Sequence, residues 1–279
     1  MKTIIVPTNF SEISLNATRF ACEYSREIDA KIILFHAYRR PFLFSSLPML
    51  FHHELERVRL EQVNKKTCQL FRNEFRSVKV EPIVYAGKIT DGIEKIMDKK
   101  NVDYIMMGVS NSNEFSKFLF GSTVYDIVQK VNLPVFVIPK TAKFKQMKKC
   151  VFAHNYLEKP SEYVIEAITK FCSKFNAELT IYGNSFNKLA DCTTQNSMLD
   201  LDFAKAGLHQ VNHVMSFSDH QHQIKDINTF VDFIKSDCLM MMLNSSKSFS
   251  KIFQKDFYAL MNKYTHLPLM VMQNQASSF

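Results

Sequence analysis

The sequence lacks the features that mark several protein classes. It contains no run of eighteen consecutive apolar residues, so we expect no membrane-spanning helix. One lysine and a short apolar run precede Pro7, and this start predicts no signal peptide. The six cysteines show no C-x-x-C spacing, so we interpret them as reduced core thiols. Reduced thiols are typical of a cytoplasmic protein, which is the location we expect.

Catalytic motifs are also missing. No nucleophile, base and acid are arranged in a recognisable pattern, and no lysine occupies a glycine-rich loop in the manner of a P-loop. We therefore assign no catalytic residue. The sequence argues against fast turnover.

The length and composition of the chain are those of an ordinary globular protein. Its 279 residues suffice for one large or two ordinary domains, with 46% apolar and 22% charged residues. The net charge of +8 is spread over both halves, and the densest cluster is Lys143, Lys145, Lys148 and Lys149. We favour a solvated linker over a nucleic-acid contact for this cluster, and we expect no nucleic-acid partner.

One stretch, from Asp103 to Pro139, organises the first half. Its apolar run Tyr104–Met107 reads as a buried parallel strand that ends at Gly108. A helix is predicted to begin at Gly121, because the Thr-x-x-Asp spacing that follows is that of a capping box. Strand, glycine loop and helix start together offer backbone N–H groups and hydroxyls, which suit phosphate oxygens.

The rest of the first half alternates between strand and helix patterns. Alternation with short connections predicts an α/β fold with a parallel sheet, right-handed crossovers and helices on both faces. The predicted strands are Thr3–Val6, Lys31–Ala37 and Val78–Tyr85, and the predicted helices start at Glu12 and span Met49–Phe75 and Thr90–Lys99.

The second half repeats the first. Residues 149–154 parallel residues 2–7, and residues 237–242 parallel residues 103–108. We therefore predict two tandem domains, residues 1–141 and residues 147–279. The second copy is degenerate, because Met242, Lys255 and Asp256 stand where the first copy has Gly108, Gly121 and Ser122.

The spacing of Gly108, two residues, Asn111, nine residues and Gly121-Ser122 resembles the G-x2-G-x9-G-[S/T] nucleotide loop of the universal stress protein family. The opening MKTIIVPTNFSEISLNATRFA and the later NLPVFVIPK are similar to the first strand and helix and to the last strand of that family. The resemblance implies two Rossmann-like domains of five mostly parallel strands in the order 3-2-1-4-5. Ligands of such sheets bind beside the first and fourth strands.

The resemblance also implies a stress-response regulatory protein that binds ATP, ADP or AMP, with Mg²⁺ accompanying the nucleotide. Asn9 stands where an acid is usual, and its carbonyl oxygen could accept a ribose hydroxyl. Asn111 replaces a glycine but tolerates the left-handed backbone region. The implied ligand-binding residues are Pro7, Thr8, Asn9, Ala37, Met107, Gly108, Asn111, Gly121, Ser122 and Thr123.

Other interpretations stay open. The glycines could merely shape a turn and pack a helix on the sheet, leaving a nucleotide-free scaffold that recruits an unidentified protein partner. Slow ATP hydrolysis is a weaker alternative. The apolar final strands, Leu133–Ile138 and Leu267–Met272, are predicted to pair within the chain about a pseudo-twofold axis, as single-domain relatives pair in dimers. A homodimer of the whole chain is a further expectation.

Two segments allow more than one reading. His209 and His213, near His220 and His222, invite a metal site, but strand geometry would place the first two about 13 Å apart. We therefore predict no metal site. The charged segment Met49–Phe75 is either a partner-binding arm or a helix that covers the sheet.

Overall fold

The structure is a computed structural model that describes residues 1–38, 49–71, 77–109, 120–155, 159–184, 189–209, 211–216, 223–244 and 267–274. Asn111 and the predicted loop 39–48 lie outside these ranges. The chain divides into two compact units, each with five strands. Unit 1 contains Met1–Ser110 and Ser122–Phe144, and unit 2 contains Asn111–Gly121 together with Lys145–Phe279. The predicted pairing of the final strands concerns the placement of the two units and stays a prediction.

Strands and helices alternate along unit 1. The strands associate in the order β3-β2-β1-β4-β5, and every neighbouring pair is parallel. The predicted order is thus confirmed. The elements are β1 (Lys2–Pro7), α1 (Glu12–Ile28), β2 (Ala30–Tyr38), α2 (Met49–Phe71), β3 (Val80–Ala86), α3 (Ile89–Met97), β4 (Tyr104–Val109), α4 (Phe120–Lys130) and β5 (Val135–Pro139).

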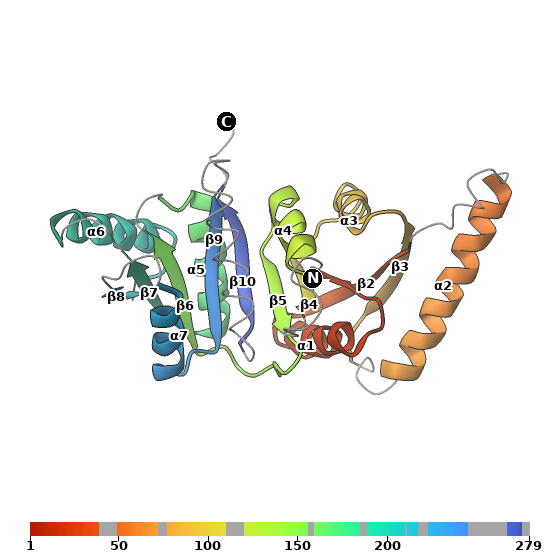
Figure 1. Cartoon of the computed structure of the whole chain (residues 1–279), viewed down its shortest axis with the longest axis horizontal. Helices are drawn as coiled ribbons and strands as arrows, with labels where there is room; N and C mark the ends of the chain where they lie inside the picture. Colours follow the sequence, from red (N-terminus) through yellow and green to blue (C-terminus); the bar gives the residue numbers. More distant parts are fainter. Residues whose placement is uncertain are drawn as a thin grey trace. The chain divides into compact units, whose positions relative to one another are not determined.

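Helices cover both faces of the unit 1 sheet. Helix α1 packs against β1, β2, β4 and β5 on one face, and α3 and α4 lie on the other (Figure 1). Lys130 of α4 lies 3.6 Å from a carboxylate oxygen of Asp91 and 3.4 Å from one of Glu94, both on α3. Ile4, Ile5 and Val6 of the central strand are completely buried, as expected for a parallel strand covered on both faces.

Unit 2 has the same topology. Its strands follow the order β8-β7-β6-β9-β10, again with parallel neighbours. This arrangement confirms the α/β fold of the second half. The elements are β6 (Lys149–Asn155), α5 (Glu162–Phe175), β7 (Glu178–Asn184), α6 (Leu189–Lys205), β8 (Val211–Ser216), α7 (Gln223–Phe233), β9 (Cys238–Asn244) and β10 (Leu269–Asn274).

The first helices of the two units share their capping chemistry. Ser11 caps α1 by accepting a hydrogen bond from the N–H of Ser14, and Ser161 caps α5 by accepting one from Val164. Both helices end at a left-handed residue, Asp29 in unit 1 and Asn176 in unit 2. The repeat seen in the sequence is therefore reproduced in local backbone geometry.

The segment between the units is anchored as well as charged. Its four lysines are exposed, but Ala142 and Met147 are buried. The ring of Phe144 packs edge-on against Phe20, with ring centroids 5.4 Å apart. The Asn16 amide on α1 donates hydrogen bonds to the backbone oxygens of Pro139 and Ala142, at 3.0 and 2.9 Å. Apolar packing and these hydrogen bonds therefore hold the start of this segment on unit 1.

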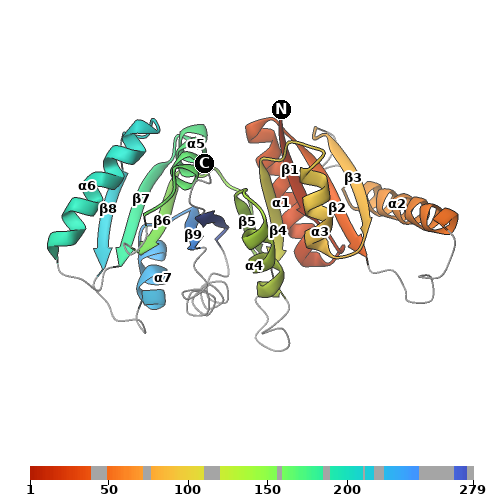
Figure 2. The same cartoon turned by 90° about the horizontal axis from the view of Figure 1, so that it is seen from above.

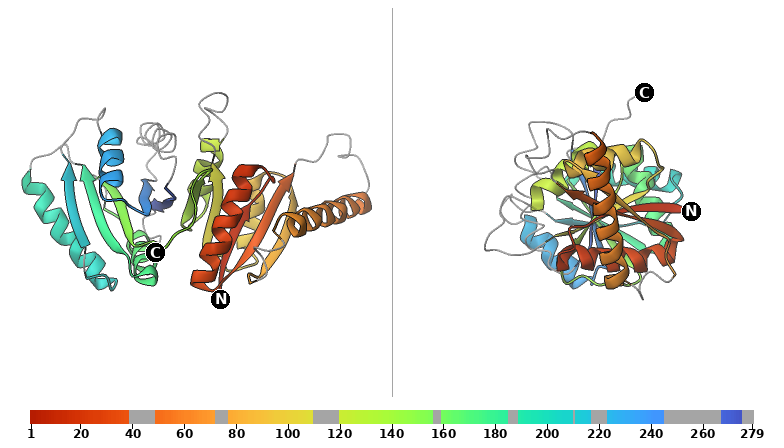
Figure 3. Two further views of the ribbon diagram at one scale, coloured as in Figure 1. Left: turned by 90° about the horizontal axis from the view of Figure 1, so that it is seen from below. Right: turned by 90° about the vertical axis from the view of Figure 1, so that its right-hand side faces the viewer.

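Helix α2 covers the sheet only in part. It lies along the edge strand β3 (Figures 1 and 3), and its side chains Val63 and Thr67 are buried. Phe51 and Val58 remain 58% and 38% exposed. The structure therefore leaves both readings of this segment open, because one part of the helix packs and another presents apolar groups to solvent.

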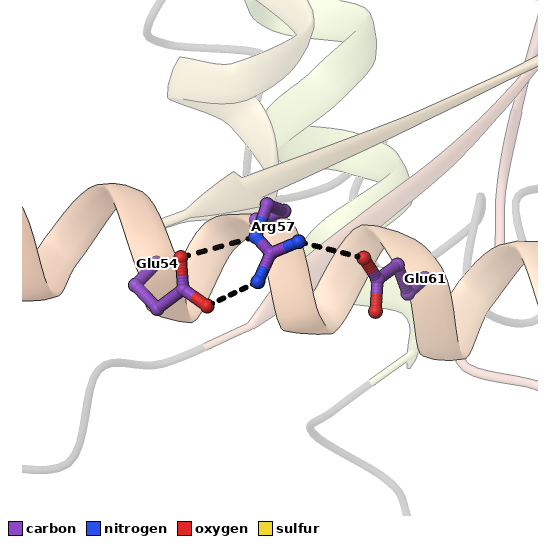
Figure 4. A network of polar contacts seen from close by, with 3 residues as sticks. All are labelled: Glu54, Arg57 and Glu61. Carbon is purple, nitrogen blue, oxygen red and sulfur yellow. Dashed lines mark hydrogen bonds and ion pairs between the residues drawn. The ribbon is translucent and has the colours of Figure 1, made fainter.

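Ion pairs join successive turns on the exposed surface of α2. Arg57 donates two hydrogen bonds to the carboxylate of Glu54 and lies 3.3 Å from Glu61 (Figure 4). The hydrogen bond from Arg57 lowers the pKa of Glu54. Because the pKa is lower in the folded state, the pair stabilises the helix above the ordinary carboxyl range and is lost as the pH falls. Its exposure keeps the contribution small.

Three of the cysteines form a buried group in unit 2. Cys150 on β6 pairs in register with Cys238 on β9, and Cys172 lies on the covering helix α5. A hydrogen bond with the Cys172 thiol, together with burial, raises the pKa of Cys150. Burial raises the pKa of Cys238. Both thiols therefore stay protonated and unreactive at ordinary pH, as predicted for core thiols.

We expect Cys22, Cys150, Cys172 and Cys238 to resist alkylation in the native protein and to react fully in denaturant, because all four are buried. Peptide mass spectrometry after N-ethylmaleimide treatment measures this for each cysteine. Between pH 7 and 9 the labelling of Cys150 and Cys238 should stay flat, whereas a solvent thiol with a pKa of about 8.5 reacts faster as the pH rises. Rapid native labelling of Cys150 or Cys238 would contradict the structure.

Candidate functional site

The candidate site lies where the strand order of unit 1 reverses, beside β1 and β4. Ile4 and Ile5 of β1 pair with Tyr104 and Ile105 of β4, so the carboxyl ends of the two strands are neighbours. Helix α1 follows β1 after a short loop, and α4 begins at the same edge of the sheet (Figure 2). Two helix N-termini with partly unpaired N–H groups therefore flank one point of the sheet edge.

The loop after β1 is held by its own polar groups. The N–H of Thr8 donates to the backbone oxygen of Phe35 at 2.8 Å, which continues the β1–β2 pairing. The Thr8 hydroxyl oxygen then accepts from the N–H of Phe10 at 3.0 Å. Phe10 adopts a φ of 62°, a left-handed conformation that is uncommon for an aromatic residue. The loop therefore has one defined path between β1 and α1.

Asn9 contributes its side-chain oxygen to this loop. Oδ1 accepts a hydrogen bond from the N–H of Ser11 and another from the Ser14 hydroxyl, each at 3.0 Å. A backbone N–H can only donate, so the orientation of the amide is fixed with the oxygen inward. The oxygen that was expected to accept a ribose hydroxyl thus already accepts two hydrogen bonds within the loop.

Gly108 has a packing role that corrects the strand boundary. It lies inside β4, paired with Ile138, whereas the sequence placed it at the strand end. A Cβ atom at this position would lie 2.5 Å from the backbone oxygen of Ile13 and 2.8 Å from Cγ2 of the same residue. Only glycine lets the first turn of α1 approach β4 this closely. This is the packing role that the sequence left open for the glycines.

The predicted site residues otherwise gather at one edge of the sheet. Pro7, Ala37 and Met107 lie at or near the carboxyl ends of β1, β2 and β4. Gly121, Ser122 and Thr123 fall in the first turn of α4, which begins at Phe120. The predicted helix start at Gly121 is therefore within one residue of the observed start, but Thr123 lies inside the helix, so the predicted capping box is wrong.

Three residues near the site were not selected from the sequence. The carbonyl of Thr8 can only accept, so the His36 Nδ1 at 2.8 Å from it carries the proton. The Phe10 ring lies 5.7 Å from the His36 ring, and the ammonium of Lys66 lies 5.3 Å from the Phe10 ring centroid. His36 precedes Ala37, which was selected from the sequence, so His36 could have been selected by its position as well. Lys66 is one of two adjacent lysines on α2, and no pattern in the sequence distinguishes it.

The corresponding edge of the unit 2 sheet carries different side chains. Asn274, at the end of β10, accepts a hydrogen bond from the N–H of Ser161 at 2.8 Å and donates one to the carbonyl of Lys159 at 3.1 Å. Met242, where unit 1 has Gly108, is buried, and His154 stacks on Phe152 with ring centroids 5.6 Å apart. The amide group of Asn274 thereby ties the end of β10 to the start of α5.

In the described part of the chain, no three His, Cys, Asp or Glu side chains are grouped in a way that could hold a metal ion. His209 is exposed, and His220 and His222 lie outside the described ranges. No helix among the described residues has both the length and the apolar character needed to cross a membrane.

Comparison with known proteins identifies the family. The model of the universal stress protein family matches residues 1–139. The universal stress proteins MJ0531 and MJ0577 of Methanocaldococcus jannaschii are each 26% identical to this chain. The first match covers 51% of this chain and 84% of the relative, and the second covers 50% and 95%.

Solved structures show the same fold over the whole length. A universal stress protein from Archaeoglobus fulgidus aligns over 98% of both chains, with a TM-score of 0.70 and 17% identity. A putative universal stress protein from Pseudomonas aeruginosa aligns over 98% of this chain and 93% of its own, with a TM-score of 0.59 and 10% identity. Through residues 1–139, the chain therefore belongs to the universal stress protein family.

Proposed function

We propose that unit 1 binds an adenine nucleotide at the carboxyl edge of its sheet and that the protein acts as a stress-response regulator without fast catalysis. The observation that carries the proposal is that two loop-to-helix transitions, Thr8–Glu12 and the first turn of α4, lie at the same edge of the sheet, beside the strands where the order reverses. Ligands of open α/β sheets bind at such reversals. Family membership of residues 1–139 supports the same assignment.

Different residues are proposed to contact the base, the ribose and the phosphates. The base would lie against the apolar strand ends at Pro7 and Ala37, with Thr8 and Asn9 beside the adenosine, and Met107 and Gly108 would lie under the ribose. The phosphates would face the first turn of α4 and would be bound by the Gly121 backbone and by the hydroxyls of Ser122 and Thr123. Asn111, from the predicted phosphate loop, completes the set.

A magnesium ion accompanying the nucleotide would depend on the phosphates. Mg²⁺ prefers carboxylate and phosphate oxygens, and Thr8, Asn9, Phe10 and Ser11 carry no carboxylate. The nearest acid of α1, Glu12, lies 3.0 Å from the ammonium of Lys140. The ion would therefore be held by phosphate oxygens and water, with little help from this loop.

Thermal shift with ATP, ADP and AMP tests the proposal. At a hundredfold excess over Kd, a bound nucleotide should raise the free energy of unfolding by about 2.7 kcal/mol. Gly121→Phe should abolish the shift, because a large side chain in the first turn of α4 fills the phosphate position. The matched control is Lys255→Phe at the corresponding position of the second copy, which should keep the full shift. No shift with any of the three nucleotides at millimolar concentration would overturn the proposal.

A scaffold function is the second candidate. The exposed apolar side chains Phe51 and Val58 on α2 favour it, because they could contact another protein. Mass analysis of small molecules released from the gently purified, denatured protein separates the two candidates. Co-purified adenine nucleotide supports the first, and an empty preparation that also shows no thermal shift supports the scaffold. Phosphate release that Gly121→Phe abolishes would instead indicate slow ATP hydrolysis.

A further inference from the structure

The amide of Asn9 presents hydrogen-bond donors to solvent. Its oxygen faces inward and accepts hydrogen bonds from Ser11 and Ser14. Asn9 is exposed, and none of the described residues accepts a hydrogen bond from its Nδ2 group. Two N–H bonds on Nδ2 are therefore directed away from the loop. A group that meets Asn9 here must supply an acceptor, and a hydroxyl that needs to donate finds none on this side chain.

A cation lies beside the same loop. The ammonium of Lys66, on α2, lies 5.3 Å from the ring centroid of Phe10, the residue that follows Asn9. Lys66 is exposed and forms no ion pair with any of the described residues. Glu12, the acid next along the chain, has Lys140 as its ion-pair partner. The surroundings of Asn9 therefore combine hydrogen-bond donors with positive charge, which favours an anion.

Dinucleotide-binding sites show which ligand groups are bound by hydrogen-bond donors combined with positive charge. A carboxylate beside the ribose accepts hydrogen bonds from its free hydroxyls, whereas sites for ribose phosphates have a cation nearby. A carboxylate would also repel a phosphate. In this chain Asn9 stands where the carboxylate would be, its acceptor oxygen is already hydrogen-bonded, and the Lys66 ammonium lies 5.3 Å from the ring of the next residue. These groups are therefore those of a site that binds a ribose phosphate.

We propose that the adenosine ligand of unit 1 carries a phosphate on its ribose 2′ or 3′ oxygen and that Asn9 Nδ2 and the Lys66 ammonium bind this phosphate. This inference rests on the proposed nucleotide function and specifies its ligand class. It distinguishes the chain from a nucleotide site that recognises a free ribose diol.

Calorimetric titration with four probes tests this ligand class. Adenosine 3′,5′-bisphosphate or adenosine 2′,5′-bisphosphate should bind at least about tenfold more tightly than AMP and ADP, because charge-assisted hydrogen bonds to the ribose phosphate are added. ADP is the essential comparison, since it also has two phosphates but carries both on the 5′ side. Equal or tighter binding of ADP would overturn the inference while leaving the proposed function intact.

Single-residue variants test whether Asn9 and Lys66 bind the ribose phosphate. Asn9→Asp keeps both inward hydrogen bonds but replaces the donors by a negative charge, so it should abolish the preference for the bisphosphate over AMP and ADP. Lys66→Gln should weaken the bisphosphate several-fold and leave AMP unchanged, and Lys65→Gln, on the neighbouring exposed lysine, should change neither. Unchanged melting temperatures confirm that the variants fold. A bisphosphate preference that survives Asn9→Asp would contradict the assignment, and no binding of any probe would refute the nucleotide function as well.

Discussion

Phe136→Ala should lower the free energy of unfolding by about 3–5 kcal/mol, the cost of truncating a fully buried aromatic residue. Phe136 lies on β5, is completely buried, and has ring centroids 5.6 Å from Tyr24 and 5.9 Å from Tyr104. Tyr24 is itself completely buried on α1, so the lost ring leaves a cavity between the sheet and this helix. Urea denaturation followed by circular dichroism measures the difference.

Phe233→Ala is the matched control for that variant. The Phe233 side chain, at the end of α7, is 82% exposed, so its removal should change stability by no more than about 0.5 kcal/mol. Equal effects of the two substitutions would mean that the aromatic cluster around Tyr24 does not form the core of unit 1.

Gly108→Val should destabilise the protein by about 3 kcal/mol, at the upper end of the usual cost of overpacking. The added Cβ would lie 2.5 Å from a backbone oxygen of Ile13, and backbone cannot rotate away as a side chain can. The first turn of α1 must therefore move away from β4. Because Ser14 of α1 holds Asn9 in place, we also expect the variant to lose nucleotide binding.

The control for Gly108→Val lies three residues earlier in the same strand. Ile105→Val removes one methylene on the opposite face of β4 and should cost about 0.5–1.5 kcal/mol, with binding retained. Chemical denaturation and thermal shift with nucleotide provide both readouts. Wild-type stability of Gly108→Val would show that α1 does not approach β4 as closely as the structure places it.

Much of the fold could be predicted from the sequence, because hydrophobic pattern determines it. The apolar runs around Ile4, Ile33 and Ile105 are all central strands, and the repeat in the second half reappears as the same strand order. The helix starts of unit 1 were predicted to within one residue, because α1, α2, α3 and α4 begin at Glu12, Met49, Ile89 and Phe120. The capping box was not, because Thr123 lies inside α4 and therefore does not cap it.

The sequence predicted the location of the candidate site more reliably than the role of each residue in it. Strand ends and glycine spacing locate residues on a sheet edge, but they do not say which partners a side chain chooses. Asn9 could have turned its oxygen to a ligand, and only the loop geometry shows that Ser11 and Ser14 take it. The contact between Lys66 and Phe10 joins residues distant in sequence, and no local pattern identifies it.

The two units differ at the corresponding edge in ways that follow from single residues. In unit 1 the N–H of the helix-capping Ser11 is satisfied by Asn9 from its own loop. In unit 2 the N–H of Ser161 is satisfied by Asn274 from β10, and the glycine that admits close packing is replaced by Met242. These differences support one nucleotide site per chain, in unit 1.

The stoichiometry of ATP binding, measured by isothermal titration calorimetry on the full chain, tests this account most directly. We predict one site per chain, retained in Lys255→Phe and lost in Gly121→Phe. A stoichiometry of two, binding that survives Gly121→Phe, or the absence of any binding heat and thermal shift with ATP would contradict it.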